Sequence, residues 1–474
     1  MESRPSAPVQ LTGQSAALVG WQFLRDPLVA LRTVHAAHGR FVILSDPLPL
    51  IKFRKVVALT VGPAFNRAVL GDPASWRTVS VGFTGPKNSA ARRLTLGIVR
   101  MNGPQHAHYR RLLVPPLRES SIEPLGDEMA RLAEAEVETW PVDEPLDLWA
   151  CVRRLMRTFA IGLLFGDDRK NGYPIADGIS SGLDNNWSMR VVACPINLPF
   201  TPYGKMLRAA ERFERSVLDW AVTKRARFDE RDLLSIIVNN PDETGKPPSD
   251  ATIAGHVPTL FAAAYETCQN VLVWILILLA QHPRVSHDLL DELQGALAGA
   301  GPTLRTVGKL PLLDAVVRET MRILPPVPLQ SRVATRDTTL MGYPARKGLR
   351  IILNNFLINR LPDLYTAPDR FRPERWNTIN PTPFEYAVFS AGPRSCPGYS
   401  FGLSVVKVAV ATILTRFRIA LAHRSRIDYK VRLALSPRGG IPATLHRQDG
   451  AFTATRIDGS LCKLVRFPDD GCDG

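Results

Sequence analysis

Residues 389–398, Phe-Ser-Ala-Gly-Pro-Arg-Ser-Cys-Pro-Gly, decide how this chain is interpreted. Cys396 lies between glycine-rich backbone and an apolar helix that the sequence predicts from about Gly398 to Thr415. Backbone N–H groups in such a turn can donate to the sulfur, and both the helix N-terminus and Arg394 favour negative charge there. The pattern therefore predicts a thiol of lowered pKa, as a metal-bound thiolate requires. A lone cysteine at the start of a helix is more often a buried structural residue.

The whole decapeptide favours the ligand interpretation. It resembles the haem-binding loop of the cytochrome P450 family, Phe-x-x-Gly-x-Arg-x-Cys-x-Gly, at every specified position. The resemblance implies that Cys396 is the axial ligand to the iron of haem b, where a thiolate favours O–O cleavage. It also implies that Phe389 packs near the haem and that Arg394 pairs with a haem propionate.

Two further segments follow the family's order along the chain. Glu319 and Arg322 are three residues apart, which places them on one face of a helix predicted over residues 310–324. A pair at this spacing is usually an exposed ion pair of little value. Here the segment Phe371-Arg-Pro-Glu-Arg375-Trp376 follows, and it resembles the family element whose arginine completes a buried triad. The resemblance gives Glu319, Arg322 and Arg375 a structural role beneath the haem.

A third segment, Ala263-Ala-Tyr-Glu-Thr-Cys268, lies within a long predicted helix. An acid followed by a hydroxyl in an apolar helix is costly without a function, although a partly exposed Glu and a back-bonded Thr would also explain it. The segment resembles the family's oxygen-activation motif, in which Glu266 and Thr267 would organise water for proton delivery. Ala264 replaces the usual Gly and Cys268 the usual second hydroxyl, so the geometry of the oxygen pocket is less well defined.

Cationic residues are expected around the haem carboxylates. His106 and Arg110, four residues apart, share a helix face, and the surrounding sequence resembles the family helix that binds a propionate. Arg332 matches another propionate-binding position. Because haem carries two carboxylates, several cationic donors are required.

The expected fold is mainly α with a minor β region. The cytochrome P450 fold would place the haem between the long helix at 251–281, capped by Asp250, and the Cys396 loop. We expect a single domain over residues 1–474, with the resemblance strongest over 20–445. We expect a strand-poor tail after the Cys396 helix, and residues 450–474 are expected to form an irregular C-terminal extension.

Composition narrows the class of protein. The chain has 474 residues, of which 45% are hydrophobic and 22% charged, as in globular proteins. The six cysteines have no regular spacing, which argues against a disulfide framework and favours a reducing compartment. No basic run or zinc motif indicates nucleic-acid binding. No stretch is long and apolar enough to predict a membrane anchor, so we expect a cytoplasmic protein. The formal charge of +15 reflects either codon bias or a basic surface for an acidic partner.

The resemblance implies a monooxygenase that activates O2 and inserts one oxygen atom into an apolar small molecule, such as a terpenoid, steroid-like or fatty compound. A ferredoxin and a ferredoxin reductase would supply the electrons. Apolar residues expected near the substrate are Phe83, Leu260, Ala263, Ala264, Val327 and Leu329. Thr259, Gln330 and Asn102 could orient one polar group of the substrate. Two alternatives stay open: a haem-thiolate enzyme that uses peroxide or rearranges its substrate, and a haem-binding sensor or carrier.

Overall fold

The computed structural model describes residues 7–46, 56–79, 85–166, 172–179, 195–228 and 232–468. Most of them are helical, as the sequence predicts. The helices are α1 (Gly13–Arg25), α2 (Pro27–His38), α3 (Pro63–Leu70), α4 (Ala90–Arg93), α5 (Gly103–Leu113), α6 (Glu119–Ile122), α7 (Gly126–Val137), α8 (Leu148–Phe165), α11 (Pro202–Ala226), α12 (Leu233–Asn239), α13 (Asp250–Ala280), α14 (Pro283–Leu297), α15 (Leu304–Val307), α16 (Pro311–Ile323), α17 (Asn355–Ile358) and α18 (Tyr399–Arg416).

The strands are short, and most lie in the first hundred residues or after α16. They are β1 (Val9–Leu11), β2 (Phe41–Ser45), β3 (Val56–Thr60), β4 (Trp76–Thr78), β5 (Pro145–Asp147), β6 (Leu329–Ala334), β7 (Thr338–Leu340), β8 (Tyr343–Ala345), β9 (Arg350–Asn354), β10 (Phe417–Leu421), β11 (Ser425–Arg426), β12 (Tyr429–Val431), β13 (Leu435–Pro437), β14 (Pro442–Arg447) and β15 (Ile457–Asp458).

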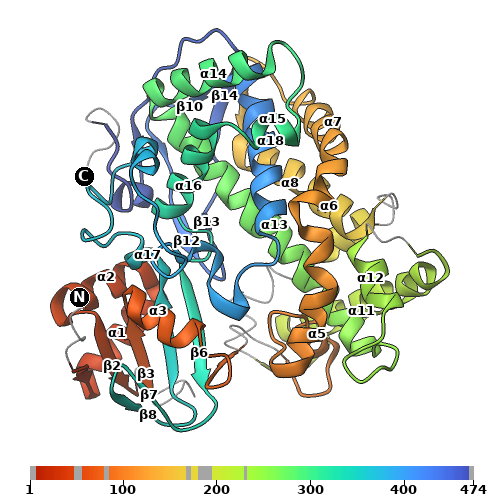
Figure 1. The fold of residues 1–474 in the computed structure, drawn as a ribbon, viewed down its shortest axis with the longest axis vertical. Helices are drawn as coiled ribbons and strands as arrows, with labels where there is room; N and C mark the ends of the chain where they lie inside the picture. The colour runs from red at the N-terminus through yellow and green to blue at the C-terminus, as the bar shows by residue number, and fades with distance from the viewer. Residues whose placement is uncertain are drawn as a thin grey trace.

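The β component forms one side of the molecule. Within the described residues, the largest sheet has the strand order β1-β2-β3-β9-β6-β4 and lies with α1 and α2 at the lower left of Figure 1. Strands β3 and β9 pair in parallel, whereas β9 and β6 are antiparallel. This arrangement brings β6, which follows α16 in the sequence, beside strands from the N-terminal region.

Helix α13 runs through the centre of the helical part, next to α18 (Figure 1). Its last ten residues, Val271 to Ala280, are buried on all sides, as their continuous apolar sequence predicts. The helix begins with Ser249 as its N-cap, whose side chain accepts from the amide of Thr252. The expectation that Asp250 is the cap was therefore wrong by one residue. Asp250 lies instead in the first turn, where a negative charge is favourable.

The C-terminal part differs most from expectation. Residues 417–458 contain several strands rather than a strand-poor tail, and β10 pairs with β14 over five residues. Part of the expected extension is also ordered: β15 pairs with β11, and η6 (Ser460–Lys463) follows. Ile457, Leu461 and Leu464 are buried and join the hydrophobic core that contains α13. The described residues after 450 are therefore built into the molecule.

Two observations bear on membrane and redox expectations. Helices α13 and α18 are long and apolar enough to cross a membrane, but both are mostly buried within the protein. Cys462 is disulfide-bonded, whereas Cys151, Cys268 and Cys396 are free thiols. The disulfide was not expected from the scattered cysteines. Disulfides are rare in reducing compartments, so this one argues against that expectation.

Candidate functional site

The loop before α18 holds Cys396 in a defined position. Its chain passes through η4 (Ala387–Phe389) and η5 (Gly392–Arg394), and the amide of Cys396 donates to the carbonyl of Phe389 at 2.8 Å. Gly392 has φ +65°, and a Cβ there would lie 2.6 Å from the carbonyl oxygen of Leu70 at the end of α3. Only glycine fits this close approach without strain. The glycine thus lets the loop pack on α3 and places the cysteine just before the first turn of α18.

The electrostatics of the Cys396 thiol differ from expectation. The residue as a whole is exposed to solvent, but its thiol is surrounded by protein, and this burial raises the pKa of the thiol. The backbone N–H of Gly398 and the charge of Arg110 lower the pKa in part. The expected net lowering is therefore wrong for the protein without a bound metal. The cation that acts on the sulfur is Arg110 rather than Arg394.

Helix α13 presents a small-residue face to solvent in its middle. Ala263 is exposed, and Ala264, Glu266 and Thr267 are partly exposed, although the helix is otherwise largely buried. The hydroxyl of Thr267 donates to the carbonyl of Ala263 at 2.6 Å, which is the back-bonded arrangement considered from the sequence. The exposed and partly exposed residues here, Ala262, Ala263, Ala264, Glu266 and Thr267, are called the α13 face below.

Cys268 connects the α13 face to the Cys396 loop. Its buried sulfur lies 3.6 Å from where a Cβ of Gly402 on α18 would stand, so the two helices touch there. Burial raises the pKa of Cys268 to about 12, and the charge of Cys396 adds to this rise. The residue in place of the usual second hydroxyl is thus a packing contact that brings α13 close to the Cys396 loop.

Three arginines and one histidine, from three segments, form what we call the open cationic cluster. They are His106 and Arg110 on α5, Arg332 on β6 and Arg394 on η5. Their charges act on one another. Burial first and the charge of Arg394 second lower the pKa of Arg332 to about 10. Burial and then the charge of Arg110 lower that of Arg394 to about 10. Burial, Arg394 and Arg110 together lower the pKa of His106 to about 4.

The arginines of this cluster donate to neutral groups. Arg110 donates to the carbonyl and hydroxyl of Ser395, and Arg394 donates to the carbonyl of Met101 and to Asn102. Arg332 donates to its neighbours Ser331 and Gln330. Among the residues that the structure describes, no carboxylate forms an ion pair with any of the three.

This donor set fits haem. A group with two carboxylates would compensate the buried positive charge. Beside the cluster, Cys396 is an exposed residue, and a Cβ on Gly398 would meet no atom within 4 Å. In the described part of the chain, no three His, Cys, Asp or Glu residues are grouped to hold a metal ion by themselves. A single sulfur ligand with separate anchors for carboxylates therefore suits the residues present.

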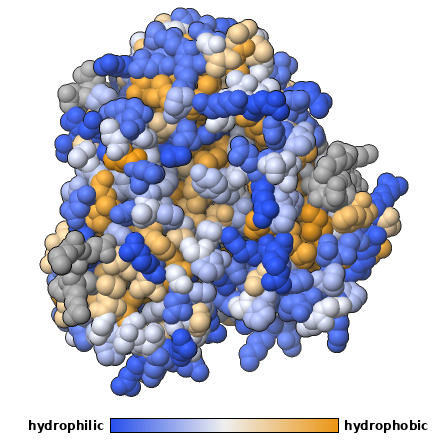
Figure 2. Space-filling view, in the orientation of Figure 1, coloured by the Kyte–Doolittle hydropathy of each residue, from blue (hydrophilic) through white to orange (hydrophobic). Residues whose placement is uncertain are grey.

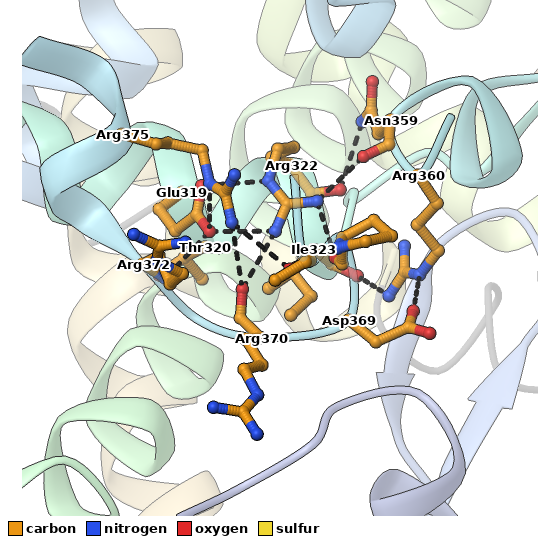
Figure 3. Close-up of polar contacts among 12 residues, drawn as sticks. Glu319, Thr320, Arg322, Ile323, Asn359, Arg360, Asp369, Arg370, Arg372 and Arg375 are labelled. Atoms are coloured by element: carbon orange, nitrogen blue, oxygen red, sulfur yellow. Dashed lines mark hydrogen bonds and ion pairs between the residues drawn. The ribbon is translucent and has the colours of Figure 1, made fainter. Parts of the chain in front are cut away.

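A second arginine group, called the closed arginine cluster, lies beneath α16 (Figure 3). Both carboxylate oxygens of Glu319 accept from Arg322 at 2.8 and 2.9 Å, and Arg375 donates to the same carboxylate at 3.0 Å. Trp376 and the amide of Arg372 donate to it as well. Glu319 and Arg322 are fully buried. The structure thus brings Glu319, Arg322 and Arg375 together, as the sequence predicts.

The apolar residues expected near the substrate take different positions. Ala263 and Ala264 belong to the α13 face, and Val327 and Leu329 are partly exposed before and within β6. Leu260 is buried, so it contributes more to packing than was expected. Phe83 lies outside the described residues. Phe389 is partly buried, and its ring contacts that of Tyr399 at 4.6 Å between centroids.

The three polar residues considered for substrate contact are already bonded within the protein. Thr259 donates to the carbonyl of Gly255, and Gln330 interacts with Ser390 and Arg332. Asn102 accepts from the amide of Thr78 and from Arg394. The side chains of Gln330 and Asn102 are therefore occupied, whereas the Thr259 oxygen can still accept a hydrogen bond.

Sequence reasoning missed the residues that hold the cationic side chains. Asn102 precedes α5, where it would be expected to cap the helix, but its side chain makes no cap and instead binds Arg394. Ser395 holds Arg110 from the position before Cys396. Both contacts join segments almost 300 residues apart, so no local pattern reports them.

Comparison with known proteins identifies the family of the chain. The sequence model of the family described as "Cytochrome P450" matches residues 71–440. Cytochrome P450 137 of Mycobacterium tuberculosis is 30% identical over 66% of this chain and 64% of its own length. The match thus spans slightly less than two thirds of that relative. Pentalenene oxygenase of Streptomyces avermitilis is 25% identical over 85% of this chain and 88% of its own.

Solved structures show the same fold. The structure described as retinoic acid bound cyanobacterial CYP120A1 superimposes with a TM-score of 0.79 and covers 94% of this chain and 100% of its own. Its sequence is 22% identical, so this likeness speaks for the fold alone.

Proposed function

The chain belongs to the cytochrome P450 family, and from that premise we propose that it is a haem-dependent monooxygenase that inserts one oxygen atom of O2 into an apolar small molecule. The observation that carries the proposal is Cys396, an exposed residue, beside buried and partly buried arginines that have no carboxylate partner among the described residues. That combination is costly for a protein that binds no dianionic metal complex at this position. The relative that is named an oxygenase supports the reaction type.

In this proposal, haem b is held by residues of four segments. Cys396 is the axial ligand, Phe389 packs nearby, and the open cationic cluster binds the two carboxylates. When bound, a haem with a thiolate ligand supplies the redox chemistry that cleaves O2. The closed arginine cluster has no free donor directed at a ligand, so its proposed role is to fix α16 and the segment that leads to the Cys396 loop.

Glu266 and Thr267 are proposed to move protons at the α13 face. The Thr267 hydroxyl donates to Ala263 at rest, which leaves its oxygen able to accept from water at the exposed surface of the helix. Glu266 is one residue away and partly exposed, so it can exchange protons with solvent. A donor positioned in this way is what general acid catalysis requires.

The substrate is proposed to be mainly apolar, such as a terpenoid, steroid-like or fatty compound. The partly exposed residues of the α13 face and of the segment before β6 are mostly apolar, and burying apolar surface gains about 25 cal/mol per Å2. Gln330 and Asn102 are bonded within the protein, so of these three residues only Thr259 offers a polar atom, the oxygen of a hydroxyl that already donates to Gly255. Titrations that gave spin shifts with highly charged compounds and none with terpenoids, steroids or fatty acids would contradict this class.

We further propose a ferredoxin and its reductase as electron donors in the cytoplasm. The net charge of +15 would favour an acidic partner, and the mainly hydrophilic surface in Figure 2 is compatible with transient docking. Reduction driven by opposite charge should slow as salt rises, because the screening length is about 10 Å at 0.1 M. A rate independent of ionic strength would instead favour codon bias as the origin of the charge.

The ligand assignment is tested by Cys396→His. The variant should still bind haem, but its reduced CO complex should lose the strongly red-shifted Soret band that a thiolate ligand produces. Cys151→Ser is a matched control, since Cys151 is also a free thiol but is buried on α8 beside Arg154. Retention of the red-shifted band in Cys396→His would show that another residue ligates the iron.

The proton-delivery role is tested by Thr267→Ala. This variant should consume O2 and reducing equivalents while releasing peroxide in place of product, because the positioned hydroxyl is lost. The ratio of product formed to NAD(P)H consumed, measured with reconstituted donors, reports the effect. An unchanged ratio would remove Thr267 from the mechanism, whereas product formed without NAD(P)H consumption would favour a peroxide-driven or rearranging enzyme.

A further inference from the structure

Ser390, in the loop that leads to Cys396, has a backbone conformation that side chains rarely adopt. Its φ is +58° and its ψ is −171°, at the edge of a region that is essentially confined to glycine. Such a conformation persists only where the surrounding structure holds it, and conformations of this kind cluster at functional sites. The contacts of Ser390 therefore need an explanation.

The conformation of Ser390 orients the peptide bond that joins it to Phe389. The amide of Ser390 donates to the carbonyl of Ala387 at 3.0 Å, and the carbonyl of Phe389 accepts from the amide of Cys396 at 2.8 Å. Both polar groups of this peptide are thus hydrogen-bonded, and one of them reaches the cysteine directly. The strained residue therefore helps to set where the backbone of Cys396 lies.

The side chain of Ser390 leaves the loop and reaches β6. Its hydroxyl donates to the Oε1 atom of Gln330 at 3.0 Å, and the same oxygen accepts from the Nη2 atom of Arg332 at 3.3 Å. The amide nitrogen of Gln330 makes a longer contact, 3.5 Å, with the carbonyl of Ala387. Two donors thus converge on one oxygen and hold the Gln330 amide in one orientation. Without the hydroxyl, the amide is free to turn its N–H groups toward Arg332, which has no acceptor for them.

We propose that Ser390 and Gln330 are positioning residues that connect the loop of the axial ligand to Arg332, so that the cysteine and a carboxylate-binding arginine keep a fixed separation. The inference rests on the proposed haem function, because Cys396 and Arg332 are both assigned to the haem. The other hydrogen bond of Arg332 goes to the carbonyl of Ser331 on its own strand, so Gln330 links it to the loop. Groups that bind one cofactor from distant segments need such supporting hydrogen bonds to stay in register.

Two substitutions of Ser390 separate its backbone from its hydroxyl in the holoprotein. Ser390→Gly removes the hydroxyl and relaxes the backbone, whereas Ser390→Ala removes the hydroxyl and keeps the strain. Hydrogen exchange of the Cys396 amide should be about fivefold faster in Ser390→Ala, the effect of one lost hydrogen bond, and no faster in Ser390→Gly. Amides of α14 report global stability and should not change. Both variants should lose haem to excess apomyoglobin about fivefold faster, because Gln330 no longer holds Arg332.

Variants of Gln330 should affect the two ends of the connection differently. Gln330→Glu keeps an acceptor for the Ser390 hydroxyl, so the Cys396 amide should exchange as in the wild type. The new carboxylate pairs with Arg332 and competes with a haem carboxylate, so haem loss should still be faster. Gln330→Leu removes the acceptor and should accelerate both processes. A residue that only stabilised the fold would change both processes together in each variant.

A double-mutant cycle measures the connection itself. In Arg332→Met the far end is missing, so adding Ser390→Gly should change the rate of haem loss by less than about twofold. Equal effects of Ser390→Gly in both backgrounds would show that Ser390 and Arg332 act independently, and would overturn the proposal. Met341→Gly is the matched control, since Met341 has φ +52° in the turn between β7 and β8. Relaxing this residue should change neither haem loss nor the exchange of the Cys396 amide.

The outcomes separate this connection from the proposed function. If the wild type binds no haem, or if Arg332→Met alone leaves haem loss unchanged, the haem assignment fails, while exchange of the Cys396 amide still tests the connection. Unchanged exchange in both Ser390→Ala and Gln330→Leu would overturn the positioning role, whether or not haem is bound. Should Gln330→Leu not fold, the two Ser390 variants and Gln330→Glu decide the same question.

Discussion

The two arginine clusters of this protein compensate their buried positive charge differently. In the closed arginine cluster, the buried guanidinium groups of Arg322 and Arg375 share the carboxylate of Glu319 (Figure 3). In the open cationic cluster, the arginines have only neutral acceptors among the described residues, and burial lowers the pKa of Arg332 and Arg394 to about 10. Burying a charge is expensive unless an opposite charge compensates it.

The difference indicates which cluster serves structure and which serves a ligand. A closed cluster contributes to the stability of the protein by itself, and it has no remaining capacity for an anion. An open cluster lowers stability until a dianion binds, so its presence beside an exposed cysteine is a signature of function. Variants of the two clusters test this distinction between structure and ligand binding.

The largest effect is expected from the closed arginine cluster. Arg322→Ala leaves the buried Glu319 carboxylate with one guanidinium fewer, and removing one partner of a buried pair costs about 3–5 kcal/mol. This is a large share of typical stability, so the variant should be misfolded and haem-free. The yield of soluble protein and its CO difference spectrum measure the outcome.

The control for this variant is Arg418→Ala, which removes an arginine from an ion pair nearer the surface. It should leave the yield of holoprotein unchanged. Recovery of soluble Arg322→Ala holoprotein with native spectra would show that the closed arginine cluster is dispensable for the fold.

A smaller and different effect is expected from the open cationic cluster. Arg394→Ala should fold, because no carboxylate is left unpaired, but it should lose haem faster by about tenfold, the effect of one charge-assisted contact of about 1.4 kcal/mol. Transfer of haem to an excess of apomyoglobin measures the rate. Arg394→Lys keeps the charge without the bidentate geometry and should lie between the two. An unchanged rate in Arg394→Ala would place the carboxylates elsewhere.

The sequence predicted the elements that depend on local patterns. The helices around Glu319 and Cys396 begin and end within two residues of expectation, since prolines and apolar periodicity mark them. The cap of α13 was misplaced because Ser249 and Asp250 are both good N-caps, and only the geometry distinguishes them. The strands after α18 were missed because each has only two to six residues, too few to show an alternating pattern.

The sequence predicted only those residues of the site that belong to recognisable motifs. The motifs identify the basic residues, but the partners of these residues depend on contacts between distant segments. We predicted from neighbours in sequence that the pKa of Cys396 is lowered. Burial, which is a tertiary property, has the larger effect and raises this pKa. Ser390 and Gln330 lie 60 residues apart and no motif links them, so only the structure reveals their contact.

Replacing Arg332 should have opposite consequences in the two forms of the protein. Arg332→Met keeps an unbranched apolar side chain and removes a buried charge that has no carboxylate partner among the described residues. In haem-free protein the variant should be more stable by about 1 kcal/mol, because apolar replacements of buried charges are often stabilising. In the holoprotein it should be less stable. Urea unfolding of both forms measures the change, and the same sign in both would argue against a carboxylate near Arg332.

The most specific prediction concerns His106, whose effect is small at neutral pH and grows as the pH falls. Burial and the neighbouring arginines lower its pKa to about 4 in the folded, haem-free protein, against about 6.5 in an unfolded chain. Between these values the unfolded chain binds a proton that the folded protein does not. The free energy of unfolding should therefore fall as the pH is lowered from about 6.5 to 4, by up to about 1.4 kcal/mol per pH unit. His106→Gln should remove this contribution.

Haem should abolish that pH dependence if the open cationic cluster binds its carboxylates, because a nearby anion raises the pKa of His106 back towards its ordinary value. His256 provides the matched control: it is fully buried on α13, its pKa is also lowered to about 4 by burial, and it belongs to neither cluster. The contribution removed by His256→Gln should be the same with and without haem, whereas that removed by His106→Gln should shrink when haem is bound. If haem changed both contributions equally, or neither, His106 would not face the carboxylates, and the open cationic cluster would lose one of its four members.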